Sequence, residues 1–580
     1  MRDSSLLNAV KLSNQDESTS MNYRSLSEVH RRQADRFGPR AALRYKRNGL
    51  YHDVSWTDYR NTAGACAAAL VDAGVKPGDR VGLLAENCLE WLFADMGILT
   101  AGAINVSPHA PLTARQVQFQ FDDAGVTWAF VSNSEQLEKL RHVRNELPRL
   151  RGIVVFDSAA VTERDAKANV IPWSVFLRRG HDRLAGLAGE LARREENTAP
   201  HDLATIMYTS GTTGNPKGVM LTQHNLISNA CASLEVSPIR TGDVVLSWLP
   251  LSHIYARLVD HYQNLVGGAV VCLAESAETL VENLAEIQPT HMAAVPRFYE
   301  KVLTAVSSPD VEKTRSRLRA IFGPRIFWLS AGGAPLPPAI AEVFCGAGLP
   351  LYQGYGLTET SPVISFNRPG QNKVGTVGLP LPGIEVKIAP DGEVLTRGPH
   401  VMKGYWNNPE STSETIRDGW LHTGDLGQID ADGYLSITGR KKELMVLSNG
   451  KKVVPPFIEG LLIADDCIDQ AVICGEGRNF LTALIVPHWE NVRSALSKVG
   501  VELNHRPEEE LAQDPAVRDL IQKRIQKALA DVSNWEQLKK FVILPKPFTV
   551  AAEELTVSLK LRRNVVLNKY RDMLNALYKE

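Results

Sequence analysis

A segment rich in hydroxyls and glycines, Tyr208-Thr-Ser-Gly-Thr-Thr-Gly-Asn-Pro-Lys-Gly-Val219, carries groups that bind phosphate. It follows a predicted strand and precedes a helical stretch. Its glycines let an anion approach backbone N–H groups, and Lys217 supplies an ammonium. The spacing of Gly211, Gly214 and Lys217 does not fit the G-x-x-x-x-G-K-S/T pattern of a Walker loop. The alternative is a flexible surface turn. We therefore predict that this segment holds the β- and γ-phosphates of a nucleotide.

A second segment, Tyr352-Gln-Gly-Tyr-Gly-Leu-Thr-Glu-Thr360, combines an aromatic ring, glycines, a hydroxyl and a carboxylate. Adenine can stack on a tyrosine ring, and a carboxylate beside phosphates is a hard ligand for Mg²⁺. An apolar strand followed by an ordinary turn is the alternative. The combination predicts a place where a nucleotide base and a magnesium ion are bound.

Two charged residues lie in short motifs further along the chain. Asp425 ends Gly419-Trp-Leu-His-Thr-Gly-Asp425, and Arg440 lies in Thr438-Gly-Arg-Lys-Lys442. A carboxylate can accept hydrogen bonds from both hydroxyls of a ribose at once. A lone aspartate after a turn is more often a helix cap or a surface charge. Only the motif around Asp425 favours contact with a ligand.

These residues need a framework of alternating helices and strands. A helical pattern over Trp56 to Ala73 is followed by short apolar runs, which is typical of layered α/β architecture with largely parallel sheets. The expected strands include Ala204 to Tyr208, Val244 to Trp248, Ala269 to Leu273 and Ile326 to Leu329.

A different pattern appears between Gly375 and Gly439. Short strands there alternate with the turns Asp391-Gly392, Asp418-Gly419 and Asp432-Gly433, which predict a β-rich subdomain. A basic cluster after Gly439 then leads into a smaller mixed region with charged helices at its end.

Bulk composition excludes several other classes of protein. With 580 residues, 44% hydrophobic and 22% charged, the chain is long enough for several packed domains. A formal net charge of −1 gives no overall field toward nucleic acid. Seven cysteines without a C-x-x-C pair favour a reducing compartment over disulfides or a thiolate zinc site. No run is long and apolar enough to be a signal peptide or a membrane span, which leaves peripheral membrane contact open.

Taken in order from about Ser55 to Arg563, the motifs resemble the adenylate-forming superfamily. This superfamily comprises acyl- and aryl-CoA synthetases, luciferases and the adenylation domains of peptide synthetases. The resemblance implies ATP, Mg²⁺ and coenzyme A as ligands, with a carboxylic acid as the other small-molecule substrate. It also implies a large N-terminal domain of layered α/β subdomains with a small β-rich subdomain, followed by a smaller, mobile α+β C-terminal domain. We expect residues 1–20 to be a flexible tail, 21–439 the N-terminal domain with its β-rich part at about 370–439, and 440–580 the C-terminal domain.

By the same resemblance, Tyr355 stacks on adenine, Thr358 bonds the α-phosphate, and Glu359 binds Mg²⁺ together with Thr209. Asp425 and Arg440 bind the ribose. The loop Ser330-Ala-Gly-Gly-Ala-Pro-Leu336 lines the adenine pocket. The remaining nucleotide contacts are expected from Ser210, Gly211, Thr212, Thr213, Gly214, Lys217, Gly333, Ala334, Gln353, Gly354, Gly356 and Lys442.

Two catalytic candidates complete the set. His253, in Leu249-Pro-Leu-Ser-His-Ile-Tyr-Ala-Arg257, matches a family position near the reacting carboxylate, although a single histidine on an apolar stretch is more often a core residue. Lys560 matches the lysine that neutralises charge where the carboxylate meets the α-phosphate. Leu559 replaces the more usual glycine, and Thr556-Val-Ser558 replaces Thr-Pro-Thr, so the register there stays open.

The implied reaction has two steps. A carboxylate attacks the α-phosphorus of ATP, pyrophosphate leaves, and coenzyme A then takes the acyl group from the adenylate. The family rotates its C-terminal domain between these steps about a hinge that matches Lys442, which presents Ser448-Asn-Gly-Lys451 in the second. His253 to Arg257, Ala294 to Lys301 and the Leu-Lys-Leu-Arg-Arg tail favour a long-chain fatty acid as substrate.

Three alternatives stay open. The acyl acceptor could be a carrier-protein thiol, or oxygen as in luciferase, and the acid could be of another kind. A nucleotide-binding scaffold without catalysis is the third, although a scaffold has no need of Lys217, Glu359, Asp425, Arg440 and Lys560 together. We expect a cytoplasmic protein, free or peripheral at a membrane, and the oligomeric state is left undetermined.

Overall fold

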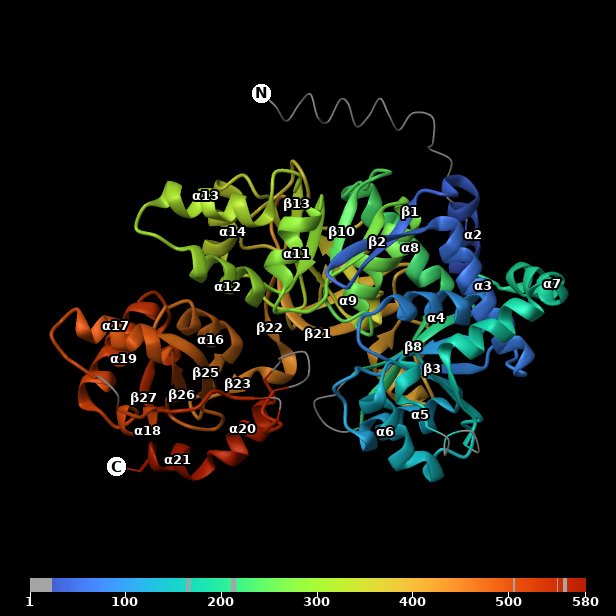
Figure 1. The fold of residues 1–580 in the computed structure, drawn as a ribbon. Helices are drawn as coiled ribbons and strands as arrows, with labels where there is room; N and C mark the ends of the chain where they lie inside the picture. Colours follow the sequence, from blue (N-terminus) through green and yellow to red (C-terminus); the bar gives the residue numbers. More distant parts are fainter. Residues whose placement is uncertain are drawn as a thin grey trace. The chain divides into compact units, whose positions relative to one another are not determined.

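The computed structural model describes residues 23–162, 165, 168–209, 215–503, 506–549, 551–555 and 561–579 (Figure 1). The chain divides into two compact units. Unit 1 comprises residues 1–387, 395–423 and 429–436, and unit 2 comprises 388–394, 424–428 and 437–580. The boundary expected near Gly439 and the hinge at Lys442 stay predictions.

Unit 1 contains an eight-stranded sheet in the order β19-β9-β8-β4-β3-β5-β6-β7. The strands from β8 to β7 run parallel, and β9 and β19 add antiparallel at one edge. The bounds are β3 Arg80–Leu84, β4 Ile104–Val106, β5 Val126–Val131, β6 Gly152–Val155, β7 Val170–Pro172, β8 Leu203–Thr209, β9 Lys217–Thr222 and β19 Gly404–Tyr405.

Successive residues of these strands enter two different cores because side chains alternate across a sheet. Trp128 and Phe130 of β5 belong to the core that also holds residues of α3 (Trp56–Asp72), α4 (Leu89–Thr100) and α7 (Trp173–Asn197). Ala129 and Val131 belong to the core with α5 (Ala114–Ala124) and α6 (Ser134–Val143). Burial on both faces explains why the strands are continuous apolar runs.

A nine-stranded sheet, β16-β15-β14-β13-β12-β10-β11-β1-β2, forms the other part of unit 1. Its middle strands, from β14 to β1, are parallel, whereas β2, β15 and β16 pair antiparallel at the two edges. The bounds are β1 Ala41–Arg47, β2 Leu50–Ser55, β10 Val244–Ser247, β11 Val270–Leu273, β12 His291–Ala294, β13 Trp328–Ala331, β14 Leu351–Gly356, β15 Val363–Phe366 and β16 Leu379–Pro380.

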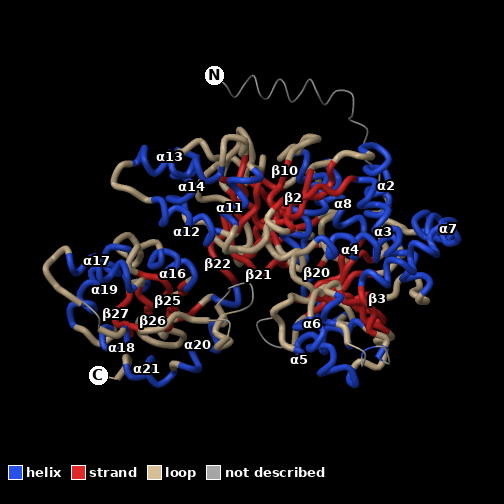
Figure 2. Tube along the Cα trace, viewed as in Figure 1, coloured by secondary structure: helices blue, strands red, loops and turns tan. Residues whose placement is uncertain are grey.

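Helices pack against both faces of this sheet, and Figure 2 distinguishes the helices from the strands. Val245 of β10 lies in the core shared with α8 (Gln223–Val236) and α10 (Gln263–Gly267). Val244 and Leu246 lie in the core formed with the helices α11 to α14. Those helices are α11 Leu280–Ile287, α12 Pro296–Val306, α13 Val311–Phe322 and α14 Pro338–Gly346. The predicted α/β class with parallel sheets is confirmed.

The β-rich region is a third sheet, β17-β18-β21-β20, with β22 paired to β21. Its strands are β17 Glu385–Ile388, β18 Glu393–Arg397, β20 Ile416–Arg417, β21 Trp420–Ile429 and β22 Leu435–Arg440. Each Asp-Gly pair lies between two of these strands. Asp418 and Gly419 both have positive φ, 51° and 76°, as a two-residue hairpin turn with right-handed twist requires.

Unit 2 has its own sheet and its own core. β25 (Ile468–Cys474) pairs antiparallel with β26 (Leu481–Pro487), which pairs parallel with β27 (Leu538–Ile543). A short pair, β23 Met445–Val446 and β24 Lys452–Val453, precedes them. The helices are α16 Pro455–Ile463, α17 Trp489–Ser497, α18 Glu508–Leu511, α19 Pro515–Ala528, α20 Arg563–Lys569 and α21 Arg571–Ala576. Within the described residues, no helix combines the length and apolar character that a membrane-spanning segment needs.

Close packing of α3 on α7 depends on one glycine. A Cβ built on Gly180 would lie 1.9 Å from the carbonyl oxygen of Ala65 in α3.

We expect Gly180→Ala to lower the free energy of unfolding by about 1–3 kcal/mol, because the two helices must move apart. Gly186→Ala, on an exposed and open part of the same helix, should instead stabilise by up to about 1 kcal/mol. Thermal and denaturant unfolding of both variants measures the difference, and equal midpoints would contradict this account of the packing.

Candidate functional site

The predicted phosphate segment joins β8 to β9 as an antiparallel hairpin. Thr209 ends β8 and pairs in register with Lys217, which begins β9. The two ends of the connection therefore lie side by side, while Ser210, Gly211, Thr212, Thr213 and Gly214 lie outside the described residues. The helical stretch expected after the segment is present as α8 (Gln223–Val236). Before it, Val219 and Leu221 are buried in one core and Met220 packs on another, so this alternation continues β9 to Thr222.

A tyrosine that the sequence did not indicate lies beside Lys217. The short strand β19 pairs with β9, with Tyr405 opposite Val219. This places the Lys217 Nζ 5.0 Å from the centre of the Tyr405 ring. The Tyr405 hydroxyl donates a hydrogen bond of 2.9 Å to Glu359 Oε1. Burial, and then the charge of Glu359, raise the pKa of Tyr405, so its hydroxyl keeps the proton that it donates.

The second motif starts on a strand and ends in a tight turn. Gln353, Gly354, Tyr355 and Gly356 lie on β14, and Thr358 and Glu359 lie in the 3₁₀ turn η5, Thr358–Thr360. The backbone N–H of Met402 donates to the Glu359 carbonyl oxygen at 2.9 Å, which fixes this turn to the segment that leads into β19.

Both glycines of this motif are required by close neighbours. A Cβ on Gly356 would lie 1.8 Å from the carbonyl oxygen of Pro362, and one on Gly354 would lie 2.9 Å from the Phe366 ring. The strand β15 therefore approaches β14 more closely than side chains would permit. Tyr355 lies between these glycines and packs against the small core of Ile364, Leu381 and Ile384.

His253 lies at the start of a short helix beside the predicted adenine loop. It caps α9 (Ile254–Ala256), accepting a hydrogen bond of 3.2 Å at Nδ1 from the Tyr255 N–H. The Tyr255 hydroxyl is 2.9 Å from Ser330 Oγ. A Cβ on Gly332 would lie 2.9 Å from the Tyr255 ring, so this ring fills the space in front of the turn that contains Gly333 and Ala334. Gly333 has a φ of 80°, which favours glycine.

A π-helical segment, η4 (Arg257–Tyr262), follows directly and is unusually polar for a buried element. Arg257 is fully buried. Its guanidinium donates to Leu251 O at 3.1 Å, to Thr205 Oγ1 of β8 at 3.1 Å and to Ser107 Oγ. Burial raises the pKa of Asp260 to about 8. Arg257 thus fixes the His253 segment to the strand that ends at Thr209.

The predicted ribose ligands form a pair within unit 2. Asp425 Oδ1 lies 2.8 Å from Arg440 Nε. Asp425 lies within β21 and is 3% exposed, so it is neither a helix cap nor a surface charge, while Arg440 ends the neighbouring strand β22. Lys442 is exposed in the 3₁₀ turn Lys441–Glu443. Beside it, Lys441 pairs with Asp391 at 2.6 Å and Glu393 at 3.1 Å.

The structure brings together only some of the predicted site residues. Lys217 lies over the Tyr405 ring, and Glu359 accepts a hydrogen bond from the Tyr405 hydroxyl. Asp425 forms an ion pair with Arg440. No hydrogen bond joins Thr209 to Glu359 within the described ranges. Lys560 lies outside the described residues. Nothing in the local sequence around Gly404-Tyr405-Trp406 indicates a contact with Glu359, because the contact arises from strand pairing between distant segments.

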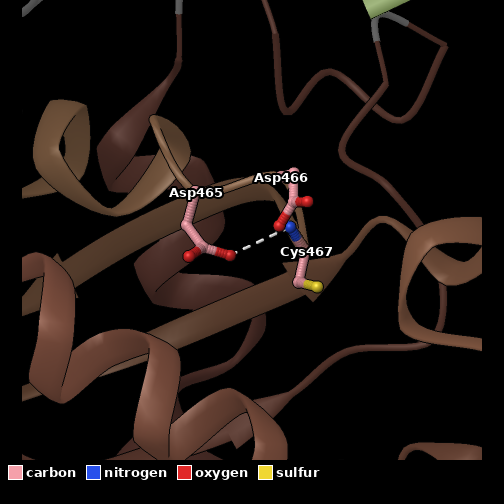
Figure 3. Close-up of side chains that lie close together, drawn as sticks. All are labelled: Asp465, Asp466 and Cys467. Atoms are coloured by element: carbon pink, nitrogen blue, oxygen red, sulfur yellow. Dashed lines mark hydrogen bonds between the residues drawn. The ribbon is translucent and has the colours of Figure 1, made fainter. Parts of the chain in front are cut away.

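Another group of possible metal ligands, Asp465, Asp466 and Cys467, lies in unit 2 at the start of β25 (Figure 3). One Asp465 oxygen accepts a hydrogen bond of 3.0 Å from the Cys467 backbone N–H. The Arg524 guanidinium lies 3.3 Å from Asp465 and 3.2 Å from Asp466 and compensates their charge. Burial raises the pKa of the Cys467 thiol to about 12, so it stays protonated and is a poor ligand. These residues fit an ion pair beside a turn better than a metal site.

Comparison with known proteins identifies the family. The model of the AMP-binding enzymes matches residues 30–406, and that of the AMP-binding enzyme C-terminal domain matches residues 442–580. A long-chain-fatty-acid–CoA ligase of Mycobacterium bovis, FadD15, is 33% identical over 92% of this chain and 93% of its own length. The long-chain-fatty-acid–CoA ligase heimdall of Drosophila melanogaster is 29% identical over 100% of this chain and 98% of its own length.

Among solved structures, the anthranilate CoA ligase AuaEII in complex with anthranoyl-AMP has a TM-score of 0.76. It is 20% identical and covers 96% of this chain and 98% of its own, which establishes the shared fold. The extent of the two family matches and the identity to the Mycobacterium bovis ligase over nearly the whole chain lead to one conclusion: the chain belongs to the family of AMP-binding enzymes.

Proposed function

We propose that this protein is an AMP-forming acid–thiol ligase that converts a long-chain fatty acid to its acyl-adenylate with ATP and then to acyl-CoA. The observation that carries the proposal is the meeting of Lys217 and Glu359, from two distant motifs, at the Tyr405 ring. An ammonium and a carboxylate held near each other suit the phosphates of a nucleotide and the cation that accompanies them. The similarity to ligases named for long-chain fatty acids supports the substrate class.

In the first step, we assign phosphate binding to Lys217, Thr209 and the loop between them. Glu359 fits a magnesium site because Tyr405 bonds only its Oε1, and in the described part of the chain Oε2 accepts no hydrogen bond. Thr209 would be the second protein ligand. A bound Mg²⁺ would neutralise phosphate charge and favour the departure of pyrophosphate. Tyr355, Gln353 and the glycines beside them, with Gly333 and Ala334, would form the adenine site.

For the reacting carboxylate, we assign positioning to His253 and α-phosphate binding to Thr358. The Tyr255 N–H donates to His253 Nδ1, which orients the imidazole ring. Lys560 would neutralise the charge that develops where the carboxylate attacks the α-phosphorus, which lowers the barrier because the ammonium is placed in advance.

The nucleotide sugar and the second step are assigned to residues of unit 2. Asp425 is buried and already oriented by Arg440, so its carboxylate suits a fixed pair of ribose hydroxyls. Lys442 is the proposed hinge, and Ser448 to Lys451 the segment used for thioester formation. A reducing, cytoplasmic setting, consistent with seven free cysteines, is part of the same proposal.

A direct test measures thioester formation with acids of increasing chain length, with carboxylate-dependent pyrophosphate exchange measured in parallel. We expect both activities, with the highest rates for long-chain acids and free coenzyme A. Exchange without acyl-CoA, but with transfer to a holo-carrier protein, would change the acceptor. Rates that favour short or aromatic acids would change the substrate class. No exchange with any acid would leave a nucleotide-binding scaffold.

Removing the proposed metal ligand should impair adenylation rather than folding. We expect Glu359→Gln to lower pyrophosphate exchange at limiting Mg²⁺ about 10²-fold, because an amide is a poor Mg²⁺ ligand and the lost stabilisation is worth several kcal/mol. Glu342→Gln, at an exposed position of α14, is the control. An unchanged Mg²⁺ dependence in Glu359→Gln would remove Glu359 from the metal role.

Loss of the lysine should separate the two half-reactions. We expect Lys560→Ala to slow adenylation roughly 10²–10³-fold, since one preorganised charge partner is lost, while acyl-CoA formation from synthetic acyl-adenylate stays near normal. Lys579→Ala, an exposed lysine in the same terminal region, controls for charge alone. If both half-reactions fall equally, Lys560 is structural or another lysine has this role.

The hinge assignment predicts a conformational block. Proline fixes φ near −65° and removes the N–H, so Lys442→Pro can accommodate one of two backbone states at most. We expect one half-reaction to survive and the other to fall at least about tenfold. Lys442→Ala, which keeps the backbone free but removes the expected nucleotide contact, should shift both rates in the same direction and leave their ratio within about threefold of wild type. Equal, small effects of proline on both rates would show that Lys442 is an ordinary exposed residue.

A further inference from the structure

Tyr405 contacts both Lys217, with its ring, and Glu359, with its hydroxyl, and the lysine and the glutamate form no direct ion pair within the described residues. From this arrangement we propose that Tyr405 is a positioning residue: its ring seats Lys217 and its hydroxyl orients Glu359 for the magnesium–nucleotide complex. The inference rests on the proposed function in that it takes Lys217 and Glu359 as ligands of that complex. It adds a residue and a physical role that neither of the two motifs contains.

The backbone of Tyr405 is fixed from both sides. Lys403 N donates to Met220 O at 3.0 Å and Trp406 N donates to Gly218 O at 2.7 Å, which tie this segment to β9. Met402 N donates to Glu359 O at 2.9 Å, which ties it to η5. The same few residues thus join the strand of Lys217 to the turn of Glu359. Any shift of β19 would move the tyrosine relative to both side chains.

Gly404 and Thr412 fix the position of Tyr405 against helix α15. The Tyr405 N–H donates to Thr412 Oγ1 at 2.9 Å, in α15 (Pro409–Thr415). A Cβ on Gly404 would lie 2.7 Å from the Thr412 methyl carbon, and Gly404 has a φ of 141°, so only glycine lets β19 lie this close to α15. Tyr405 is 8% exposed, so its side chain has little freedom to move.

The charges explain why an aromatic hydroxyl suits this place. Within the described ranges, no carboxylate lies within ion-pair distance of Lys217, and the face of the Tyr405 ring is its neighbour at 5.0 Å. An aromatic face attracts an ammonium without cancelling its charge. A direct Lys217–Glu359 ion pair would instead use up both groups, and a bound magnesium–nucleotide complex would have to break it.

The hydroxyl has the complementary role toward Glu359. A phenol donates one hydrogen bond, so it can hold Oε1 at 2.9 Å and leave Oε2 for a cation. An arginine or lysine at this position would neutralise the carboxylate and weaken its affinity for Mg²⁺. Partners that orient a ligating carboxylate in this way typically change metal affinity about 10–100-fold when they are removed.

The test compares Tyr405→Phe, Tyr405→Leu and Tyr262→Phe. The last is the matched control, because the buried Tyr262 also donates a hydrogen bond to a carboxylate, Asp95 of α4 at 3.0 Å, and both residues lie outside the two motifs. Calorimetric binding of α,β-methylene-ATP, with and without MgCl₂, gives a readout that needs no turnover. Pyrophosphate exchange against Mg²⁺ concentration gives the second, and thermal unfolding checks that each variant is folded.

For Tyr405→Phe we expect the half-saturating Mg²⁺ concentration to rise about 10–100-fold, with binding of the metal-free analogue and the KM for the acid near wild type. Tyr405→Leu should also weaken binding of the metal-free analogue roughly 3–10-fold, because Lys217 loses its cation–π contact with the ring. Tyr262→Phe should change neither. If Tyr405→Phe keeps the wild-type Mg²⁺ dependence, or if Tyr262→Phe shifts it equally, the positioning role is wrong.

The two proposals can fail separately. If wild type shows no pyrophosphate exchange with any acid, while Tyr405→Phe still shifts the Mg²⁺ dependence of analogue binding, the proposed reaction is wrong and the positioning role stands. If wild type catalyses exchange, but the variants bind Mg²⁺ and the analogue as wild type does, the reaction stands and the positioning role is wrong.

Discussion

Antiparallel pairing of β19 with β9 is the contact on which the candidate site depends. It adds two residues, Gly404 and Tyr405, to the edge of a sheet whose other strands are mostly parallel. An edge strand offers unpaired N–H and C=O groups, and here a distant segment of the same chain uses them. The register of this pairing decides that Tyr405, rather than its neighbour Trp406, reaches Lys217 and Glu359.

The same edge also fixes the other side of the phosphate segment. Trp406 donates from its indole N–H to the carbonyl oxygen of Asp123 at 3.0 Å, and the Tyr208 hydroxyl donates to the Asp123 carboxylate at 2.5 Å. Asp123, near the end of α5, therefore connects β8 and the segment after β19. These two bonds hold β8 and the segment after β19 on either side of Lys217.

A second constraint is the buried guanidinium of Arg257. Burying a charge is costly unless hydrogen bonds satisfy it, and Arg257 has Leu251, Thr205 and Ser107 as acceptors and the Trp91 ring at 4.7 Å. These partners come from the His253 segment, β8, the segment after β4, and α4. The π-helical turn after Ala256 places the arginine where all of them can be reached, as π-bulges often do near functional sites. One side chain thus couples the two large sheets of unit 1.

Residue types and spacings alone determined the outline of this protein. Apolar runs between amphipathic helices predicted the α/β class, and the Asp-Gly pairs predicted the turns of the third sheet, because both follow from local backbone preferences. The hydroxyl-rich loop and the Tyr-Gly-Leu-Thr-Glu motif predicted phosphate and metal chemistry, because their donors and acceptors are close in sequence.

Tertiary structure alone decided the rest. Pairing with β8 makes residues 217–222 a strand before helix α8 begins, and Asp425 lies buried within β21. The need for Gly356 arises from the approach of Pro362, and the role of Tyr405 arises from pairing between segments almost two hundred residues apart. Such contacts depend on register and close packing, which no local pattern encodes.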